Sequence, residues 1–274
     1  MDYSIYFIPT PIGNLEDMTI RAINILKQVD IIACEDTRES KKLLDYYDID
    51  KPLTSYHKFN EMAKGKEIIE NTKVGKTYGI ITDQGMPGIS DPGHILIKKC
   101  IEEEIAYTIL PGASSLITAL VGSGLDNDEF SYYGFVPKKN SDKKNLYDKL
   151  QEEEKTSIIF DTPYNLENTI KDFKKNFPDR KLCIARELTK KFEEYILYDI
   201  SKIDTSDITL KGEFVLILSG KIIKNNESLE DYKVEIKSLL EEGKRTKDIS
   251  KIIKDKSSFS KNEIYDYIIS LQKN

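Results

Sequence analysis

Cysteine, histidine and tryptophan are scarce in this sequence: its 274 residues include three cysteines, two histidines and no tryptophan. Cys34, Cys100 and Cys183 are odd in number and far apart, and no two of them form a C-x-x-C pair. This spacing argues against a disulfide framework and against a zinc site. Because all three cysteines lie in apolar runs or on helix faces, we expect buried thiols and no bound metal.

The sequence also lacks a long hydrophobic segment. No apolar run approaches the ~20 residues that span a bilayer, and the N-terminus carries an acid, Asp2, where a signal peptide would carry basic residues. With 39% hydrophobic and 32% charged residues, the composition is typical of a soluble globular protein, and we expect it to be cytoplasmic. The formal net charge of −6 argues mildly against nucleic acid as a partner, although it does not exclude a local basic face.

Common nucleotide-binding and metalloenzyme motifs are missing as well. No G-x-G-x-x-G follows the first expected strand, and the chain has neither a P-loop nor an H-E-x-x-H helix. What is present is a dense turn at residues 82–93, with three glycines and two prolines. Glycine lets a ligand approach the backbone closely, and proline fixes a loop before anything binds. Because ligands of α/β proteins bind at the carboxyl ends of strands, this turn, which follows an expected strand, predicts a binding loop.

Strand-like and helix-like patterns alternate along the first 121 residues. The expected strands are at residues 3–8, 29–34, 53–56, 76–82 and 105–110, and the expected helices are at 19–26, 35–44, 62–71, 94–101 and 113–121. Such alternation predicts a parallel α/β sheet with helices on both faces. Three further loops that directly follow expected strands, at residues 9–13, 35–38 and 111–115, would meet the dense turn at one edge of this sheet.

Residues 122–128 form the best linker, because they are short, polar and glycine-bearing. Beyond the linker, strands are expected at 130–135, 157–160, 182–185, 194–198 and 213–218, which favours a second α/β or α+β unit. The tail repeats apolar residues at helical spacing, with Thr246 as a helix cap and Ser260 with Glu263 as a capping box. The expected domains are 1–124, 125–221 and 222–274, the last being a small three-helix domain.

Four motifs in one order carry a resemblance to a known family. They are residues 8–15 (IPTPIGNL), 34–38 (CEDTR), 82–93 (TDQGMPGISDPG) and 110–115 (LPGASS). With them, the sequence resembles the ribosomal RNA small subunit methyltransferase I family, from about residue 3 to residue 220. The resemblance implies the two-domain α/β fold of the tetrapyrrole methylases (class III methyltransferases), with a small C-terminal helical domain. It also implies S-adenosylmethionine as cofactor, 2′-O-methylation of a cytidine ribose in 16S ribosomal RNA, and a homodimer.

The same resemblance implies which residues hold the cofactor, in a cleft between the two domains. The matching positions are Pro11, Asp83, Gln84, Gly85, Pro87, Ile89, Ser114 and Ser115 in the first domain, and Phe160, Asp161, Arg186, Glu187, Leu188, Thr189, Gly212, Glu213 and Phe214 in the second. The chain departs from the family pattern at Gln84, where a small residue is usual. It departs again at Asn165, where the family has a basic residue, which leaves the role of that position open.

The candidate catalytic residues are Glu35, Asp36, Arg38, His57 and Lys190. A ribose hydroxyl is a poor nucleophile, so a proton acceptor or a nearby cation should assist it. Glu35 or Asp36 is the predicted acid–base or orienting residue. Arg38, Arg186 and Lys190 are the predicted contacts to RNA or to the alkoxide. The residues at 35–38 can instead form a structural ion pair and a helix cap.

The two histidines have different settings in the sequence. His57 follows an expected strand and precedes Asn60 and Glu61, so we predict a contact with substrate, with a structural role as the alternative. His94 opens an expected helix and should be structural or solvent-facing.

Lysine and arginine cluster locally despite the negative total. The clusters are Lys138, Lys139, Lys143 and Lys144; Lys174, Lys175, Arg180 and Lys181; and Lys190 with Lys191. The tail after Gly220 has 12 Lys or Arg against 10 Asp or Glu. This pattern supports contact with RNA, although a solvated charged face explains each cluster as well. The alternatives are a methyltransferase for a tetrapyrrole or another small molecule, and a non-catalytic RNA-binding assembly factor.

Overall fold

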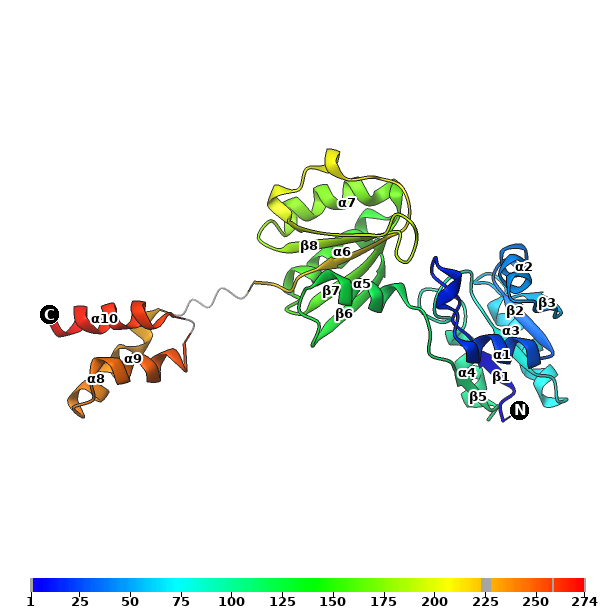
Figure 1. Ribbon diagram of the computed structural model, residues 1–274, viewed down its shortest axis with the longest axis horizontal. Coiled ribbons are helices and arrows are strands. Elements are labelled where there is room, and N and C mark those ends of the chain that lie inside the picture. Colours follow the sequence, from blue (N-terminus) through cyan, green and yellow to red (C-terminus); the bar gives the residue numbers. More distant parts are fainter. Residues whose placement is uncertain (1, 223–227, 258, 274) are drawn as a thin grey trace. The chain divides into compact units, whose positions relative to one another are not determined.

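The computed structural model describes residues 2–222, 228–257 and 259–273. The chain splits into two compact units, Met1–Lys221 and Ile222–Asn274. The larger unit contains two five-stranded sheets, and the described part of the smaller unit is helical (Figure 1).

The first sheet is wholly parallel, with strand order β3-β2-β4-β1-β5. Its strands are β1 (Ile5–Phe7), β2 (Ile31–Cys34), β3 (Leu53–Ser55), β4 (Tyr78–Ile80) and β5 (Tyr107–Ile109). The helices between them are α1 (Ile20–Gln28), α2 (Thr37–Tyr46), α3 (Glu61–Lys73) and α4 (His94–Glu102), with the short 3-10 helix η1 (Leu15–Asp17) before α1. The predicted parallel α/β sheet is confirmed, although each strand is shorter than expected.

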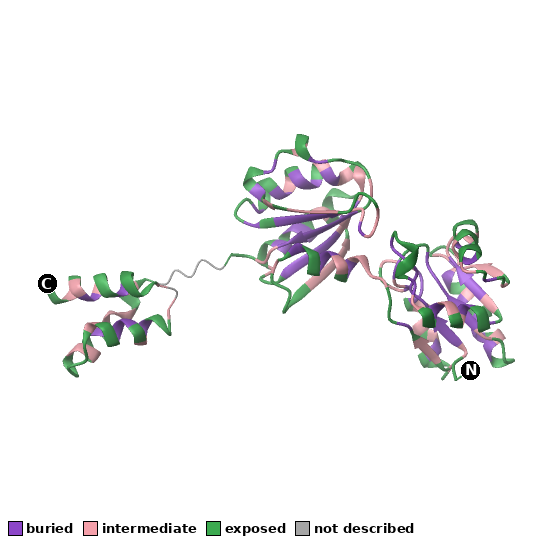
Figure 2. Ribbon diagram, viewed as in Figure 1, coloured by how far each residue is buried: buried purple, intermediate pink, exposed green. Residues whose placement is uncertain are grey.

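Two apolar clusters cover opposite faces of this sheet. In β1, Tyr6 packs into the cluster that includes residues of α1 and α2, while Ile5 and Phe7 pack into the cluster that includes residues of α3 and α4. Successive side chains of a strand point to opposite faces, so helices cover both faces, as predicted. The three central strands, β1, β2 and β4, form the buried centre of this part of the chain, whereas the edge strands β3 and β5 are only partly buried (Figure 2).

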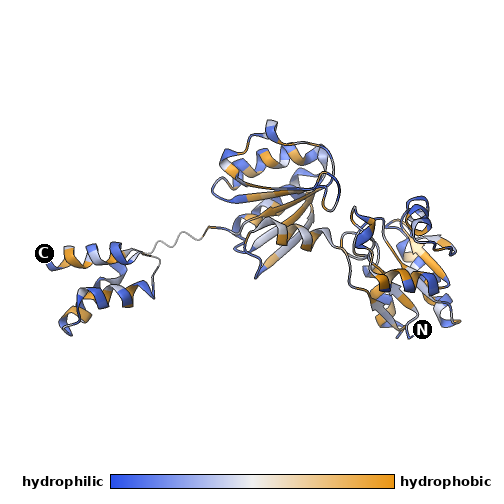
Figure 3. Cartoon of the chain, viewed as in Figure 1, coloured by the Kyte–Doolittle hydropathy of each residue, from blue (hydrophilic) through white to orange (hydrophobic). Residues whose placement is uncertain are grey.

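The second sheet is mixed, with strand order β6-β7-β10-β8-β9. Its strands are β6 (Phe130–Phe135), β7 (Thr156–Asp161), β8 (Lys181–Arg186), β9 (Glu194–Asp199) and β10 (Phe214–Leu218). Only the pair β6–β7 is parallel among these neighbours. One face is covered by α6 (Asn140–Glu152) and α7 (Pro163–Asn176), with the short 3-10 helices η2 (Ile200–Lys202) and η3 (Thr205–Asp207) following β9. Apolar residues concentrate on the strands and on one side of each helix (Figure 3).

The helix α5 (Ser115–Ser123) packs on the second sheet, although the sequence pattern assigned it to the first. Its apolar residues Leu116, Ala119 and Leu120 join a cluster with residues of β7, β8 and β10. The predicted linker is also shortened, because its first two residues continue this helix. Gly124 then ends the helix in a left-handed conformation, with φ of +65°.

The smaller unit has a core of its own. After the 3-10 helix η4 (Leu229–Tyr232), α8 (Lys233–Glu241), α9 (Thr246–Lys254) and α10 (Lys261–Lys273) bury five isoleucines completely. The predicted capping box before α10 is confirmed, since the Ser260 N–H donates to the Glu263 carboxylate (2.8 Å) and the Glu263 N–H donates to the Ser260 hydroxyl (3.3 Å). The predicted cap at Thr246 is wrong by one residue: Arg245 occupies the cap position and makes no side-chain cap bond. Residues 223–227, at the start of the expected third domain, lie outside the described residues.

All three cysteines are free and buried, as predicted. Among the residues that the structure describes, no helix combines the length and the apolar character needed to cross a membrane. The described ranges also contain no group of three or more His, Cys, Asp or Glu side chains arranged to hold a metal ion.

Candidate functional site

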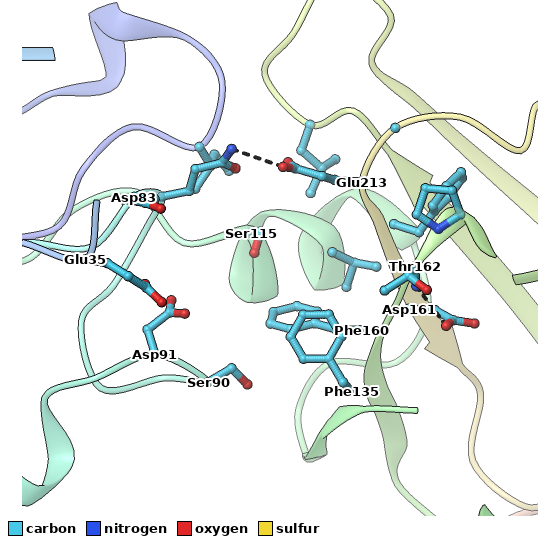
Figure 4. Close-up of a pocket in the computed structure, with 17 residues that line it drawn as sticks. Glu35, Asp83, Ser90, Asp91, Ser115, Phe135, Phe160, Asp161, Thr162 and Glu213 are labelled. Atoms are coloured by element: carbon cyan, nitrogen blue, oxygen red, sulfur yellow. Dashed lines mark hydrogen bonds between the residues drawn. The ribbon is translucent and has the colours of Figure 1, made fainter. Parts of the chain in front are cut away.

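A cavity of about 460 Å³ lies inside the larger unit, between loops of the first sheet and strands of the second (Figure 4). The first sheet contributes the loops that follow β1, β2 and β4, together with the start of α5. The second sheet contributes the ends of β6 and β7, the start of β10 and the loops beside them. The cavity therefore lies at the carboxyl ends of the parallel strands, where α/β sheets bind ligands.

The dense turn after β4 is anchored to the loop after β1. The N–H of Thr10 donates to the carbonyl of Gly85, and the N–H of Gly85 donates to the carbonyl of Thr10, both at 3.0 Å. The Thr10 hydroxyl also donates to the carbonyl of Thr82 (3.0 Å). Gly85 has a φ of +75°, a conformation that a residue with a Cβ adopts only at a cost. Two of the loops predicted to meet at the sheet edge thus contact each other.

The second half of the turn is held by a buried carboxylate, Glu61, the first residue of α3. Glu61 is 8% exposed, and its Oε1 accepts hydrogen bonds from the Gly93 N–H (3.0 Å) and the Tyr56 hydroxyl (3.2 Å). Burial, with the charge of Glu61, raises the pKa of Tyr56 well above its usual range. The turn also closes on itself, because the Gly88 N–H donates to the carbonyl of Pro92 (3.1 Å). These bonds order the tip of the turn in advance of ligand binding.

The tip of the turn contacts the second sheet at Ser90. Its φ of +63° is left-handed, which is uncommon for a residue other than glycine. The Ser90 hydroxyl lies 2.5 Å from the Tyr132 hydroxyl of β6, and its carbonyl accepts a hydrogen bond from the Lys58 ammonium. Two other segments, β6 and the loop that contains Lys58, therefore hold this strained residue in place.

Three carboxylates line the cavity on the side of the first sheet: Glu35, Asp83 and Asp91. The carboxylates of Glu35 and Asp91 point toward each other (Figure 4). Burial raises the pKa of Asp91 to about 6, with a further contribution from the negative charge of Glu35 and an opposing one from Lys58. Burial and the charge of Asp83 raise the pKa of Glu35, and burial also raises the pKa of Asp83. This wall of the cavity thus holds carboxylates that bind protons more readily than usual.

Asp36 and Arg38 behave differently from Glu35, although they are its neighbours in sequence. The Asp36 carboxylate caps α2 by accepting from the Arg38 N–H (2.8 Å), and it pairs with the Arg38 guanidinium (2.9 Å). The hydrogen bonds from Arg38 lower the pKa of Asp36 to about 2. The Arg38 side chain is 85% exposed, and neither residue lines the cavity. The ion pair and helix cap considered as an alternative are therefore present.

His57 lies beside the cavity but does not line it. Its ring makes an edge contact with Phe59, with 6.0 Å between centroids. Its buried Nδ1 has no hydrogen-bond partner among the described residues, and its position near Glu35 acts to lower the pKa of that carboxyl against the effect of burial. His94 is exposed, as predicted.

An aromatic and apolar wall faces these carboxylates from the second sheet. The ring of Phe160, in β7, packs against Phe135 (5.3 Å between centroids) and against Tyr132 (5.2 Å). Leu188 and Val215 line the cavity beside it. Such a wall can receive a flat, weakly polar ring system.

Asp161, at the end of β7, is the buried polar group of this wall, with 5% exposure. Its Oδ1 accepts from the Thr162 N–H (2.8 Å) and from the Asn165 amide (3.0 Å), while its Oδ2 has no partner among the described residues. At the position where the family has a basic residue, Asn165 instead accepts a hydrogen bond from Lys143 of α6 (3.2 Å). The cation near Asp161 therefore comes from a neighbouring helix.

A polar cluster ties the dense turn to Glu213, which directly precedes β10. The Gln84 amide donates to Glu213 Oε1 (3.0 Å), so the unusual residue at this position links the two sheets. The Lys190 ammonium donates to Glu213 Oε2 (2.9 Å) and to Glu187 Oε1 (3.1 Å). Although burial alone would lower the pKa of Lys190, these two carboxylates raise it. Arg186 is also paired, with Glu194 and with the carbonyl of Lys211.

The comparisons with known proteins agree on one family. The family model described as Tetrapyrrole (Corrin/Porphyrin) Methylases matches residues 4–204. The chain belongs to the tetrapyrrole methylase family. Within it, the chain is similar to proteins named Ribosomal RNA small subunit methyltransferase I: it is 37% identical to the protein of Bacillus subtilis (strain 168), covering 96% of this chain and 92% of that protein. It is 35% identical to the protein of Synechocystis sp. (strain PCC 6803), covering 98% of both chains.

Solved structures of two other proteins share the fold. A diphthine synthase superimposes with a TM-score of 0.64 at 14% identity, covering 79% of this chain and 89% of that one. A uroporphyrin-III-C-methyltransferase from Thermus thermophilus superimposes with a TM-score of 0.57 at 14% identity, covering 78% and 93%. The predicted two-domain class III methyltransferase fold is confirmed.

The structure brings together ten of the residues predicted for the site of this tetrapyrrole methylase. Those that line the cavity are Glu35, Asp83, Gln84, Ser115, Phe160, Asp161, Leu188, Gly212, Glu213 and Phe214. The others lie outside the lining: Pro11, Gly85, Pro87, Ile89, Ser114, Arg186, Glu187, Thr189, Asp36, Arg38, His57 and Lys190. Several of these support the lining from behind, such as Glu187, whose Oε1 accepts from the Glu213 N–H (3.0 Å). The individual roles stay predictions.

Seven lining residues were missed by the sequence reasoning. They are Ile12, Ser90, Asp91, Phe135, Thr162, Pro163 and Val215. Ser90 and Asp91 lie within the dense turn that the sequence had singled out, so its polar residues were the available signal. Ile12, Thr162 and Val215 adjoin predicted residues, and Pro163 lies two positions after Asp161, but strand ends alone do not tell which neighbour faces the cavity. Phe135, at the end of β6, has no predicted site residue beside it.

Proposed function

We propose that this chain is an S-adenosylmethionine-dependent methyltransferase that methylates the 2′-hydroxyl of a cytidine ribose in small-subunit ribosomal RNA. The observation that carries the proposal is the charge of the cavity. Five of its lining residues are carboxylic acids, namely Glu35, Asp83, Asp91, Asp161 and Glu213, and none of the described lining residues is Lys, Arg or His. A cavity with walls of one charge sign attracts a ligand of the other sign.

The residues present fit S-adenosylmethionine, which carries a sulfonium, an ammonium and a carboxylate. The volume of about 460 Å³ falls within the ~300–1,000 Å³ of ordinary ligand sites. Phe160 and Leu188 would contact the adenine, and the free Oδ2 of Asp161 would accept a hydrogen bond from a polar group of the ligand. Ser115 opens α5, where backbone N–H groups and the helix dipole favour a carboxylate.

When bound, the cofactor supplies a methyl group on a positively charged sulfur. The task of the chain is then to hold the substrate hydroxyl in line with that methyl group and to remove its proton. The ordered turn after β4 and the aromatic wall of β7 are suited to fixing both reactants. The acidic wall is suited to accepting the proton of the hydroxyl.

An acidic cavity repels phosphates, so RNA must be bound by cations at its rim. Several members of the predicted basic clusters have other partners. Arg180 is buried and donates to the carbonyls of Leu150 (2.7 Å) and Gln151 (2.9 Å), while Lys143 and Lys190 face the internal networks described above. Exposed candidates are Lys138 and Lys139, which follow the cavity residue Phe135.

The proposal is tested by methyl transfer from labelled S-adenosylmethionine to small-subunit RNA that lacks the modification, and to the assembled subunit. Digestion of the RNA to nucleosides should release labelled 2′-O-methylcytidine. Label in a tetrapyrrole but not in RNA would support the small-molecule alternative. RNA binding without any transfer would support an assembly factor. The relatives' printed names favour ribosomal RNA as the substrate. The homodimer implied by the resemblance and the cytoplasmic location expected from the composition belong to the same proposal.

A further inference from the structure

Glu35 and Asp91 come from adjacent strands and meet at the cavity. Glu35 directly follows β2, and Asp91 lies in the turn after β4, which pairs with β2. Their carboxylates point toward each other at the cavity wall (Figure 4). Neither carboxylate has a hydrogen bond to any residue that the structure describes. Two half-buried carboxylates with free oxygens are thus available to a ligand.

The groups around this pair favour the uptake of one proton. Asp83, from the same turn, adds a third negative charge, while Lys58 and His57, from the segment between β3 and α3, oppose it. Tyr132 reaches the turn from β6, through its hydroxyl contact with Ser90. Like charges at close range disfavour ionisation of both groups, so the pair titrates as a unit.

The backbone holds Asp91 in place at a cost. The preceding residue, Ser90, has a φ of +63° and is fixed by Tyr132 and Lys58, and the turn is anchored by Glu61 through Gly93. Strained residues persist where the surroundings over-determine them, and they cluster at functional sites. None of these contacts satisfies the Asp91 carboxylate itself. The turn therefore holds the Asp91 carboxylate at the cavity without a hydrogen-bond partner among the described residues.

We infer that Asp91 is the catalytic base of the methyl transfer and that Glu35 is the residue that positions its proton. This inference rests on the proposed function and assigns the proton step within it. The hydroxyl oxygen of the substrate forms a bond to the methyl carbon as the carbon–sulfur bond breaks, and the electron pair of that bond stays on sulfur. The hydroxyl proton moves to the Asp91 carboxylate. Asp36 is unsuited to this step, because it is engaged as the cap of α2 and as the partner of Arg38.

The test uses the full chain under single turnover, with saturating cofactor and RNA. Asp91→Asn should slow transfer by about 100-fold, as expected for loss of a general base, with cofactor affinity within threefold of wild type by calorimetry. Asp45→Asn, which removes an exposed carboxylate of α2, should transfer at the wild-type rate. Thermal melting of each variant shows whether it is folded.

The pH profile separates the base from its positioning residue. Because the base must be ionised, the wild-type rate should rise with pH, with a limb near the pKa of Asp91, which is about 6, and then level off. Glu35→Gln removes a negative charge that raises the pKa of Asp91, so its limb should move to lower pH. Carboxyl NMR titration of the folded protein should report the same shift without any assay of activity.

Each outcome decides between the assignments. An active wild type with an equally active Asp91→Asn variant, or a limb that does not move in Glu35→Gln, would overturn the role of Asp91. Weaker cofactor binding with an unchanged saturated rate would assign the pair to binding and overturn the base as well. A wild-type protein that transfers no methyl group to RNA would instead refute the proposed function.

Discussion

At the scale of single residues, partners decide the role of each acid. Glu35 and Asp36 are adjacent in sequence and differ by one methylene, yet their pKa values shift in opposite directions. Burial raises the pKa of Glu35, whereas hydrogen bonds from Arg38 lower the pKa of Asp36. A carboxylate that caps a helix and pairs with arginine holds its charge strongly and is a weak proton acceptor. Glu35, which neither caps a helix nor pairs with arginine, is therefore better suited to proton transfer than Asp36.

Gly85 gives a prediction at this scale. Gly85→Ala should lower the free energy of unfolding by about 1–2 kcal/mol, the cost of a left-handed residue with a Cβ. It should also weaken S-adenosylmethionine binding, because the new Cβ lies 3.3 Å from Ile12 Cγ2, a side chain of the cavity wall. Calorimetry and denaturant unfolding measure the two effects.

Gly75→Ala is the matched control for this substitution. Gly75 also has a positive φ, +89°, but a Cβ there would meet nothing within 4 Å. It should lose similar stability and keep full ligand affinity. Equal affinities in both variants would contradict a role of the turn around Gly85 in binding.

The sequence could identify this turn but not its reactive residue. Glycine and proline density marks residues 82–93 as a shaped loop, because those two residue types act on the backbone directly. Ser90 and Asp91 resemble ordinary turn residues. What turns them to the cavity are contacts with Tyr132, 42 positions away, and with Lys58, 32 positions away. Such distant contacts leave no local pattern in the chain.

At the scale of elements, the buried strands were predictable and the packing of α5 was not. Most strands are short apolar runs, rich in branched or aromatic residues, and need only their own sequence to be recognised. An apolar helix face shows that a helix is packed, but not on which sheet. For α5 the deciding contacts are with Ile158, Cys183 and Val215 of the second sheet. The helix thus follows the first sheet in the chain and covers the second.

Gly122 tests this packing. A Cβ at Gly122 would overlap the ring of Tyr195 in β9, so Gly122→Ala should destabilise the protein by about 1–3 kcal/mol, as overpacking does. In a Tyr195→Ala background the same substitution should stabilise it, because alanine is favoured over glycine by ~1 kcal/mol within a helix. Denaturant unfolding of the four proteins gives the coupling energy. An effect of the same sign in both backgrounds would contradict the contact.

At the scale of the whole molecule, a net charge of −6 is compatible with RNA binding, because acidic and basic residues lie in different places. The acids gather where a cationic cofactor would bind, and cations remain exposed nearby in sequence. The resemblance to a family was needed to connect the second sheet to the cofactor, since no glycine-rich motif marks its strand ends. Charge patterning alone could not identify the rim, because each cluster mixes exposed lysines with a cation that has an internal partner, such as Lys143, Arg180 or Lys190.

The rim lysines give a prediction about salt. Lys138→Glu/Lys139→Glu should weaken RNA binding and reduce the slope of log affinity against log salt concentration, because fewer counterions are released. Cofactor affinity should stay unchanged. Lys76→Glu/Lys98→Glu makes the same charge change at exposed positions, one of them at the amino end of β4, away from the cavity. An equal loss of RNA affinity in both double variants would indicate a general charge effect.

The last prediction concerns the smaller unit, Ile222–Asn274. Its isoleucine core is self-contained, and none of its described residues lines the cavity. The larger unit should therefore end after Lys221, because the Lys221 N–H donates to the carbonyl of Glu153 (2.7 Å) and its ammonium pairs with Glu152 (2.6 Å).

Removal of residues 222–274 should leave a folded protein with cofactor affinity near that of the full chain. RNA affinity should fall by about tenfold, equivalent to ~1.4 kcal/mol. Calorimetry with cofactor and filter binding with RNA measure the two affinities separately. Loss of cofactor binding in a folded truncation would mean that the tail completes the cofactor site, and unchanged RNA affinity would remove the tail from RNA capture.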